Sequence, residues 1–152
     1  MIEKRVLVVD DDDAIRALLF TILRRRGFKV DCARTGVEAM ARCTRCRYTV
    51  MLLDLMMPQM SGFDVVDEMA RIPEDQRPVI IVLTAGSESS SRSLPANVVS
   101  GTVRKPFDIE LLVDTVAACL TAAAGADQPD DCPAPDSDCM PAKQTTRPND
   151  PN

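Results

Sequence analysis

Short, continuous runs of apolar residues alternate along this chain with longer segments whose apolar residues recur every three or four positions. The run Val6 to Val9 is the first of these, and a segment with helical spacing of apolar residues follows it. An uninterrupted apolar run is typical of a strand buried on both faces, as in a parallel sheet. We therefore predict five buried strands, over residues 6–9, 28–33, 48–53, 79–83 and 98–104.

Helices are predicted between these strands. The first has an amphipathic pattern formed by Ile15, Leu18, Leu19, Ile22 and Leu23. The second covers about residues 35–46, the third lies between 63 and 73, and the last begins after Asp108. Strands that alternate with helices in this way predict a doubly wound α/β sheet. The segment 86–97 is serine-rich with almost no apolar face, so we expect a fourth helix there to be short or irregular.

The C-terminal residues 124–152 differ in composition from the rest of the chain. They hold 2 basic and 6 acidic side chains and no apolar periodicity, and six of the 11 prolines lie there. Such a segment cannot bury enough apolar surface to offset the entropy lost on ordering. We predict a folded domain over 1–123 and a disordered Pro/Asp-rich tail over 124–152. No output domain fits in this tail, which favours a stand-alone domain over a piece of a longer protein.

Composition excludes several classes of function. The chain has no histidine, so it cannot supply a Ser–His or Cys–His nucleophile pair, a His-ligated metal or a phosphohistidine. Residues 1–123 carry 16 basic and 17 acidic side chains and the chain is only 3% aromatic, which argues against nucleic-acid binding. We find no signal peptide and no run of the ~18 apolar residues needed to insert in a membrane, so we expect a cytoplasmic protein.

The chain contains six cysteines, and a cytoplasmic location predicts that they are free thiols. Cys43 and Cys46 have the C-x-x-C spacing of zinc sites and redox pairs. No second close pair follows them, which leaves a zinc or redox site as the weaker alternative.

Polar side chains follow four of the five predicted strands. Asp10 and Asp11 follow the first strand and Asp54 the third, while Thr84 and Lys105 end the fourth and fifth. The carboxyl ends of parallel strands meet at one edge of the sheet, where ligands bind. Three converging carboxylates repel one another unless a cation lies among them, and ligands that are all oxygen favour Mg²⁺, with Mn²⁺ as a substitute.

Each of these residues has an ordinary structural explanation when taken alone. The acids 10–13 can serve the start of a helix, Asp54 can be a turn residue, and Lys105 can be a solvated lysine. Their common position at strand ends favours a shared site instead. A carboxylate, a metal ion, a hydroxyl and an ammonium together indicate phosphoryl transfer to Asp54.

Several motifs resemble those of the receiver domain of bacterial two-component response regulators, in the CheY-like superfamily. They are Val8-Val9-Asp10-Asp11, the string DLMMPQMSG from Asp54 to Gly62, Thr84-Ala85, and Lys105-Pro106-Phe107. The similarity covers about residues 4–122. It implies a (βα)5 flavodoxin-like fold with a five-stranded parallel sheet in the order 2-1-3-4-5. It also implies a signalling domain that catalyses only its own phosphorylation and dephosphorylation, rather than an enzyme.

The resemblance implies a role for each residue of the site. Asp54 is the expected phosphoacceptor, supplied by a phosphohistidine on a sensor histidine kinase or a histidine phosphotransfer protein. The expected metal ligands are Asp10, Asp11, Asp54 and the Met56 carbonyl, with Asp10 acting largely through a water. The groups expected to hold the phosphoryl group are Thr84, Lys105 and the backbone N–H groups of Met56 and Ala85. The Lys105–Pro106 peptide bond is expected to be cis.

The sequence departs from the family pattern at the residues that are expected to change position on activation. The family commonly places an aromatic residue three positions before the lysine, where this chain has Thr102, and the weak helix over 86–97 alters the usual signalling surface. Met56, two residues after Asp54, cannot orient an attacking water, so we predict slow autodephosphorylation. A homodimer and a downstream protein target are left open as partners.

Two rival functions are considered. A pseudo-receiver would use the same fold as a constitutive binding module, but the full set of Asp11, Asp54, Thr84 and Lys105 argues against it. A flavodoxin-like cofactor binder would need a phosphate-binding loop after the first strand, where this chain has four aspartates.

Overall fold

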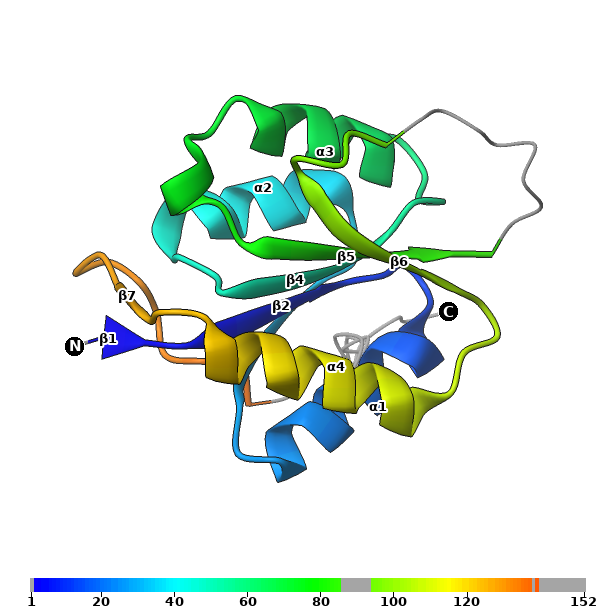
Figure 1. The fold of residues 1–152 in the computed structure, drawn as a ribbon, viewed down its shortest axis with the longest axis horizontal. Helices are drawn as coiled ribbons and strands as arrows, with labels where there is room; N and C mark the ends of the chain where they lie inside the picture. The colour runs from blue at the N-terminus through cyan, green and yellow to red at the C-terminus, as the bar shows by residue number, and fades with distance from the viewer. Residues whose placement is uncertain (1, 86–93, 138, 140–152) are drawn as a thin grey trace, which may run out of the picture.

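A five-stranded parallel sheet in the order β3-β2-β4-β5-β6 forms the centre of the protein in the computed structural model, which describes residues 2–85, 94–137 and 139 (Figure 1). Its strands are β2 (Arg5–Val9), β3 (Lys29–Ala33), β4 (Val50–Asp54), β5 (Val79–Thr84) and β6 (Val99–Arg104). The helices are α1 (Asp13–Arg25), α2 (Gly36–Arg45), α3 (Gly62–Ala70) and α4 (Ile109–Ala122), with a 3-10 turn at η1 (Glu74–Gln76). This order confirms the predicted doubly wound sheet.

Helices cover both faces of the sheet. Figure 1 shows α2 and α3 on one face and α1 and α4 on the other. Successive residues of the central strands point to opposite faces. Leu53 of β4 therefore packs on the α2–α3 side and Leu52 on the α1–α4 side, both fully buried. Burial on both faces explains why the strands read as continuous apolar runs.

Side-chain caps fix where the helices begin. Asp12 accepts hydrogen bonds from the first-turn amides of α1, and Asp108 accepts one at the start of α4. Ser61 and Asp64 form a reciprocal capping box on α3. The caps place the start of α1 close after the carboxyl end of β2, and the start of α3 after the loop 55–61 that follows β4.

The apolar stripe of α1 differs from the predicted one at Leu18, while Ile15 and Ile22 pack against the core as expected. The buried residues of α1 are Arg16, Leu19, Phe20 and Leu23, whereas Leu18 is 50% exposed. The prediction of Leu18 as a core residue was therefore wrong. The buried set keeps the i, i+3, i+4, i+7 spacing but contains an arginine, which a purely apolar pattern passes over.

The link from β5 to β6 has no helix in its described part. Residues 94–98 form a turn, with hydrogen bonds from the Val98 and Val99 amides to the Pro95 carbonyl, and residues 86–93 lie outside the described part. The predicted short or irregular fourth helix falls largely on those residues. Thr102 of β6 is exposed. A small polar side chain suits an exposed position of this strand.

The C-terminal segment differs from the disordered tail predicted over 124–152. Residues 124–137 and 139 are described, and β7 (Ala126–Asp127) pairs antiparallel with β1 (Ile2–Glu3), seen at one end of the sheet in Figure 1. Residues 138 and 140–152 lie outside the described part. The prediction considered apolar burial alone, whereas polar contacts and disulfides hold this segment.

The cysteines correct a second prediction. Cys32 is joined to Cys139 and Cys46 to Cys132, with Cα–Cα distances of 5.9 and 5.0 Å. The structure therefore contradicts the expectation that all six are free thiols. Cys43 and Cys119 are free. Among the described helices, none has both the length and the apolar character to cross a membrane.

Candidate functional site

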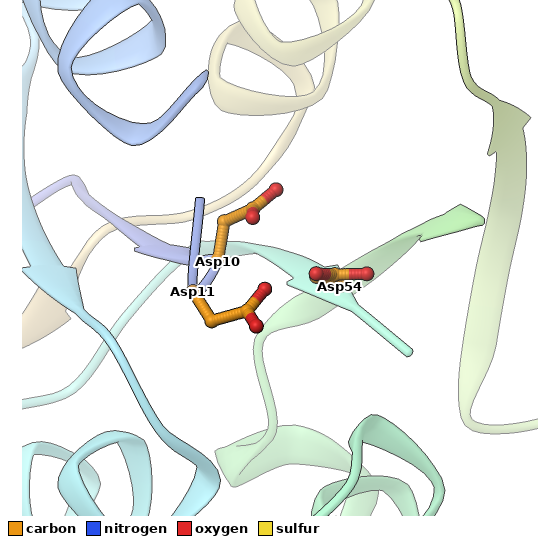
Figure 2. Close-up of side chains that lie close together, drawn as sticks. All are labelled: Asp10, Asp11 and Asp54. Atoms are coloured by element: carbon orange, nitrogen blue, oxygen red, sulfur yellow. The ribbon is translucent and has the colours of Figure 1, made fainter. Parts of the chain in front are cut away.

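Three carboxylates lie together at the carboxyl edge of the sheet. Asp10 and Asp11 follow β2, and Asp54 ends β4, the neighbouring strand (Figure 2). Each offers an oxygen within 4.8 Å of those of the other two. Asp10 is 0% exposed and Asp54 3% exposed, whereas Asp11 is open to solvent. The structure thus brings together the three side chains that the sequence placed at strand ends.

Backbone and side-chain contacts fix Asp10 in place. Its amide donates to the carbonyl of Ala33, and its Oδ1 accepts from the amide of Asp12 at 2.9 Å. Its own carbonyl accepts from the guanidinium of Arg16 at 2.8 Å. These contacts leave Oδ2 facing Lys105, 3.0 Å from its Nζ.

Lys105 follows β6, the outermost strand on the other side of β4 from β2, and supplies positive charge to the site. Its Nζ lies 3.0 Å from Asp10 and 3.6 Å from Asp54. Its amide donates to the carbonyl of Thr84 at 2.7 Å, and the following bond to Pro106 is cis, as the sequence predicted. Burial alone would lower the pKa of Lys105, but its hydrogen bond to Asp10 and the charges of Asp10 and Asp54 raise it above the usual value. The lysine is therefore a fixed cation of the site.

One lysine does not balance three carboxylates. Burial and, next in size, the nearby charge of Asp10 raise the pKa of Asp54, whereas the Met56 amide and Lys105 lower it, and the net result is a pKa of about 7. The site therefore resists full ionisation by itself. A hard divalent cation with oxygen ligands, such as Mg²⁺, fits this excess of carboxylate charge. The side chains that would hold it are Asp10, Asp11 and Asp54.

The loop after β4 folds closely around Asp54. The Met56 amide donates to Asp54 Oδ1 at 3.1 Å, while the Met56 side chain is 60% exposed. Gln59 has a positive φ of 66°, which turns the chain back toward α3. A Cβ on Gly62 would lie 2.5 Å from the Asp54 carbonyl oxygen, so only glycine allows this approach.

Thr84 and Ala85 lie at the same edge, on the next strand. Asp54 pairs with Leu83 in the β4–β5 register, which puts Thr84 one residue beyond Asp54 along the sheet. Thr84 is half-buried and Ala85 is exposed. Residue 85 is the last described before residues 86–93, so the structure gives the strand-end position of Ala85 only.

Arg16 belongs to this site although the sequence reading passed over it. It is 1% exposed, donates to the Asp10 carbonyl and pairs with Asp13. Its signal in the sequence was its place in the buried i, i+3, i+4, i+7 stripe of α1, together with Leu19 and Leu23. A charged residue in such a stripe needs a buried partner, and here the partner is the backbone that carries Asp10.

Comparison with known proteins finds a family model that matches residues 6–117, described as the response regulator receiver domain. Transcriptional regulatory protein ResD of Bacillus subtilis is 38% identical over 125 residues, which are 80% of this chain and 50% of that protein. Response regulator MprA of Mycobacterium leprae is 38% identical over 119 residues, 76% of this chain and 50% of that protein. The chain thus spans about half the length of these relatives.

Solved structures of response regulators also resemble this chain. The response regulator TrrA from Thermotoga maritima, determined in complex with Mg²⁺ and BeF, superposes with a TM-score of 0.67 at 34% identity, over 76% of this chain and 98% of that one. The chemotaxis response regulator CheY4 of Vibrio cholerae gives 0.68 at 30% identity, over 77% and 98% of the two chains.

Proposed function

The chain belongs to the family of response regulator receiver domains, and from that premise we propose that Asp54 accepts a phosphoryl group from a phosphohistidine on a partner protein. The observation that carries the proposal is the position of the Asp54 carboxylate. It is buried at the sheet edge between two further aspartates and the ammonium of Lys105. This arrangement brings the nucleophile together with the charged groups that would bind a metal ion and the phosphoryl oxygens.

The transfer is a displacement at phosphorus. An oxygen of Asp54 forms the new P–O bond while the P–N bond to the partner imidazole breaks, and its electron pair returns to the imidazole nitrogen, which takes a proton. Because this chain has no histidine, the donor must be another molecule. Since the Met56 amide holds Oδ1 and Lys105 lies on the Oδ2 side, the carboxylate is oriented before the donor arrives.

A bound Mg²⁺ would neutralise carboxylate and phosphoryl charge and bring the two together. Its proposed ligands are Asp10, Asp11, Asp54 and the Met56 carbonyl. The Asp12 amide and Lys105 hold the Asp10 carboxylate in one orientation. A carboxylate with a fixed orientation is suited to be a metal ligand. The buried excess of negative charge and the complex of TrrA with Mg²⁺ and BeF both support this proposal.

The remaining residues would hold the phosphoryl oxygens. Lys105 is already within 3.6 Å of Asp54 and would pair with one of them. Thr84 would donate its hydroxyl, and the backbone N–H groups of Met56 and Ala85 would donate to the others. All of these donors stand at the ends of neighbouring strands or in the loop after β4, so a group on Asp54 lies among them.

The proposed partners are a sensor histidine kinase or a histidine phosphotransfer protein, with a downstream protein as the target of the phosphorylated state. The proposed place of the reaction is the cytoplasm. A constitutive pseudo-receiver is the competing function, and nothing in the site favours it. Because residue 102 is a threonine, the proposed switch has no aromatic side chain at that position.

The test is phosphorylation with acetyl phosphate in the presence of Mg²⁺, read by intact mass. Wild type and the control Asp67→Asn, whose side chain is exposed on α3, should each gain one phosphoryl group. Asp54→Asn should gain none, and chelation of Mg²⁺ should abolish the gain in wild type. Equal labelling of Asp54→Asn, or no labelling of wild type by acetyl phosphate and by any phosphorylated kinase tested, would leave the pseudo-receiver as the better account.

A further inference from the structure

The C-terminal segment, taken as residues 126–137 and 139, lies against the outer strand of the sheet and the end of α2, far from Asp54 in the sequence. One disulfide joins Cys132 to Cys46, the C-cap residue directly after α2, and another joins Cys139 to Cys32 in β3. Between the two bridges, the Cys32 amide donates to Asp136 Oδ2 and the Asp136 amide donates to Asp31 Oδ1, each at 2.9 Å. The segment therefore covers part of the β3 edge, which would otherwise present unpaired backbone groups.

The buried guanidinium of Arg5 contacts the Cys46–Cys132 disulfide. Arg5 is 1% exposed, and its Nη1 contacts the sulfur of Cys132 and lies 3.5 Å from that of Cys46. Its Nη2 donates to the Pro133 carbonyl at 2.7 Å, and its Nε lies 3.2 Å from Asp31. Arg5 thus connects the sheet, the bridge and the C-terminal segment.

The contact of Arg5 with both sulfurs bears on how this bridge reacts. An adjacent guanidinium stabilises a cysteine in its thiolate form. A disulfide opens faster when the departing sulfur is the more stable thiolate and when the attacked sulfur is accessible. Cys46 is 2% exposed, whereas Cys132 is only partly buried, so attack is directed to Cys132 and Cys46 departs beside Arg5.

The second bridge has a different environment. Cys32 and Cys139 are 6% and 5% exposed, which shields both of its sulfurs from an attacking thiolate. Burial raises the pKa of the free Cys43 thiol to about 12, so that residue is not a competing nucleophile near neutral pH.

We propose that Cys46–Cys132 is a reversible thiol–disulfide site, opened by a dithiol reductant, and that its opening releases the C-terminal segment from the β3 edge. A reductant thiolate attacks the Cys132 sulfur, and the bond to Cys46 breaks with its electron pair on Cys46. The second reductant thiolate then displaces Cys132, leaving two protein cysteines reduced and the dithiol oxidised to a cyclic disulfide. Intracellular disulfides of this kind are commonly redox-sensing. The site is independent of phosphoryl transfer at Asp54.

The experiment is a timed reduction of the oxidised full chain with dithiothreitol, without denaturant and without a phosphoryl donor. Thiols are trapped with a maleimide and assigned by peptide mass, and amide hydrogen exchange is followed in parallel. Cys46 and Cys132 should be labelled at least about tenfold faster than Cys32 and Cys139. Exchange in the peptides covering 128–136 should rise when the first bridge opens.

Two cysteine variants are matched controls. Cys132→Ser should show the raised exchange over 128–136 without reductant, whereas Cys139→Ser should keep the fast reduction of Cys46–Cys132. Arg5→Lys, which retains a cation, should slow the reduction less than Arg5→Gln. The proposal is overturned if Cys32–Cys139 opens first or at the same rate, if the first bridge opens without a rise in exchange, or if Cys46 and Cys132 fail to pair under oxidising conditions.

Discussion

The ammonium of Lys105 and a carboxylate oxygen of Asp10 lie 3.0 Å apart, although their strands, β6 and β2, are separated in the sheet by β4 and β5. Asp54, at the end of β4, lies between them in the sheet order and is 3.6 Å from the same ammonium. The lysine therefore partly neutralises these two buried acids. It also competes for their charge with any metal ion that binds there.

Replacing Lys105 should separate metal binding from phosphorylation. In Lys105→Met, we expect tighter Mg²⁺ binding because the competing cation is gone, but much slower phosphorylation because the phosphoryl oxygens lose a partner. Without metal, the unfolding free energy should fall by about 1–3 kcal/mol, since two buried carboxylates lose their cation. Calorimetric Mg²⁺ titration and acetyl-phosphate labelling measure the two effects, with exposed Lys4→Met as control. Weaker Mg²⁺ binding in Lys105→Met would contradict this reading.

Neutralising Asp54 should stabilise the metal-free protein above pH 7. Its pKa is raised from 3.8 to about 7 in the folded state, so its protonated form favours folding below pH 4 and that contribution is lost as pH rises through 7. Asp54→Asn does not titrate and should gain about 1–2 kcal/mol over wild type at pH 8, after allowance for screening by solvent.

The gain of Asp54→Asn should shrink toward pH 4 and be reduced by Mg²⁺, which stabilises the ionised wild type. Urea unfolding followed by circular dichroism at pH 4, 5.5 and 8, with and without chelator, gives the comparison. A stability difference that does not change with pH would show that Asp54 titrates normally in the folded chain.

A methyl group at Gly62 should disturb the backbone that carries Asp54. The added Cβ would lie 2.5 Å from the Asp54 carbonyl oxygen and 2.7 Å from the Leu55 Cα, both of them backbone atoms that cannot easily move. Gly62→Ala should therefore cost about 1–3 kcal/mol of stability and slow the labelling of Asp54. Gly101→Ala is the matched control, because a Cβ there meets nothing within 4 Å. Equal stability of the two variants in urea would refute the steric argument.

The side chain of Met56 should set the lifetime of the phosphorylated state. It is 60% exposed beside Asp54 but has no group that can orient a water. Met56→Asn should speed autodephosphorylation by on the order of tenfold, because an amide can position the attacking water. Decay of the phosphorylated mass after removal of acetyl phosphate measures this rate. Met56→Leu should decay as wild type does, and an unchanged rate in Met56→Asn would count against the role given to this position.

Local patterns were enough to predict the sheet and the edge at which the strand-end acids meet. Apolar runs such as Val6–Val9 are buried on both faces, and parallel strands carry the acids that follow them to one edge. The convergence of Asp10 with Asp54 was therefore predictable from strand ends alone. Arg16 and Leu18 were not placed correctly, because the apolar stripe of α1 was read without allowing a charged residue inside it.

By itself, the sequence determined the order of strands and helices and the residue types at the strand ends, since both follow from spacing within a few residues. Only the tertiary structure decided what covers the β3 edge. Cys32 and Cys139 are 107 residues apart, and the contact of Arg5 with Cys132 joins residues 127 positions apart. Periodicity reports on the burial of neighbouring residues, whereas disulfides and buried ion pairs depend on which distant segments the fold brings within bonding distance.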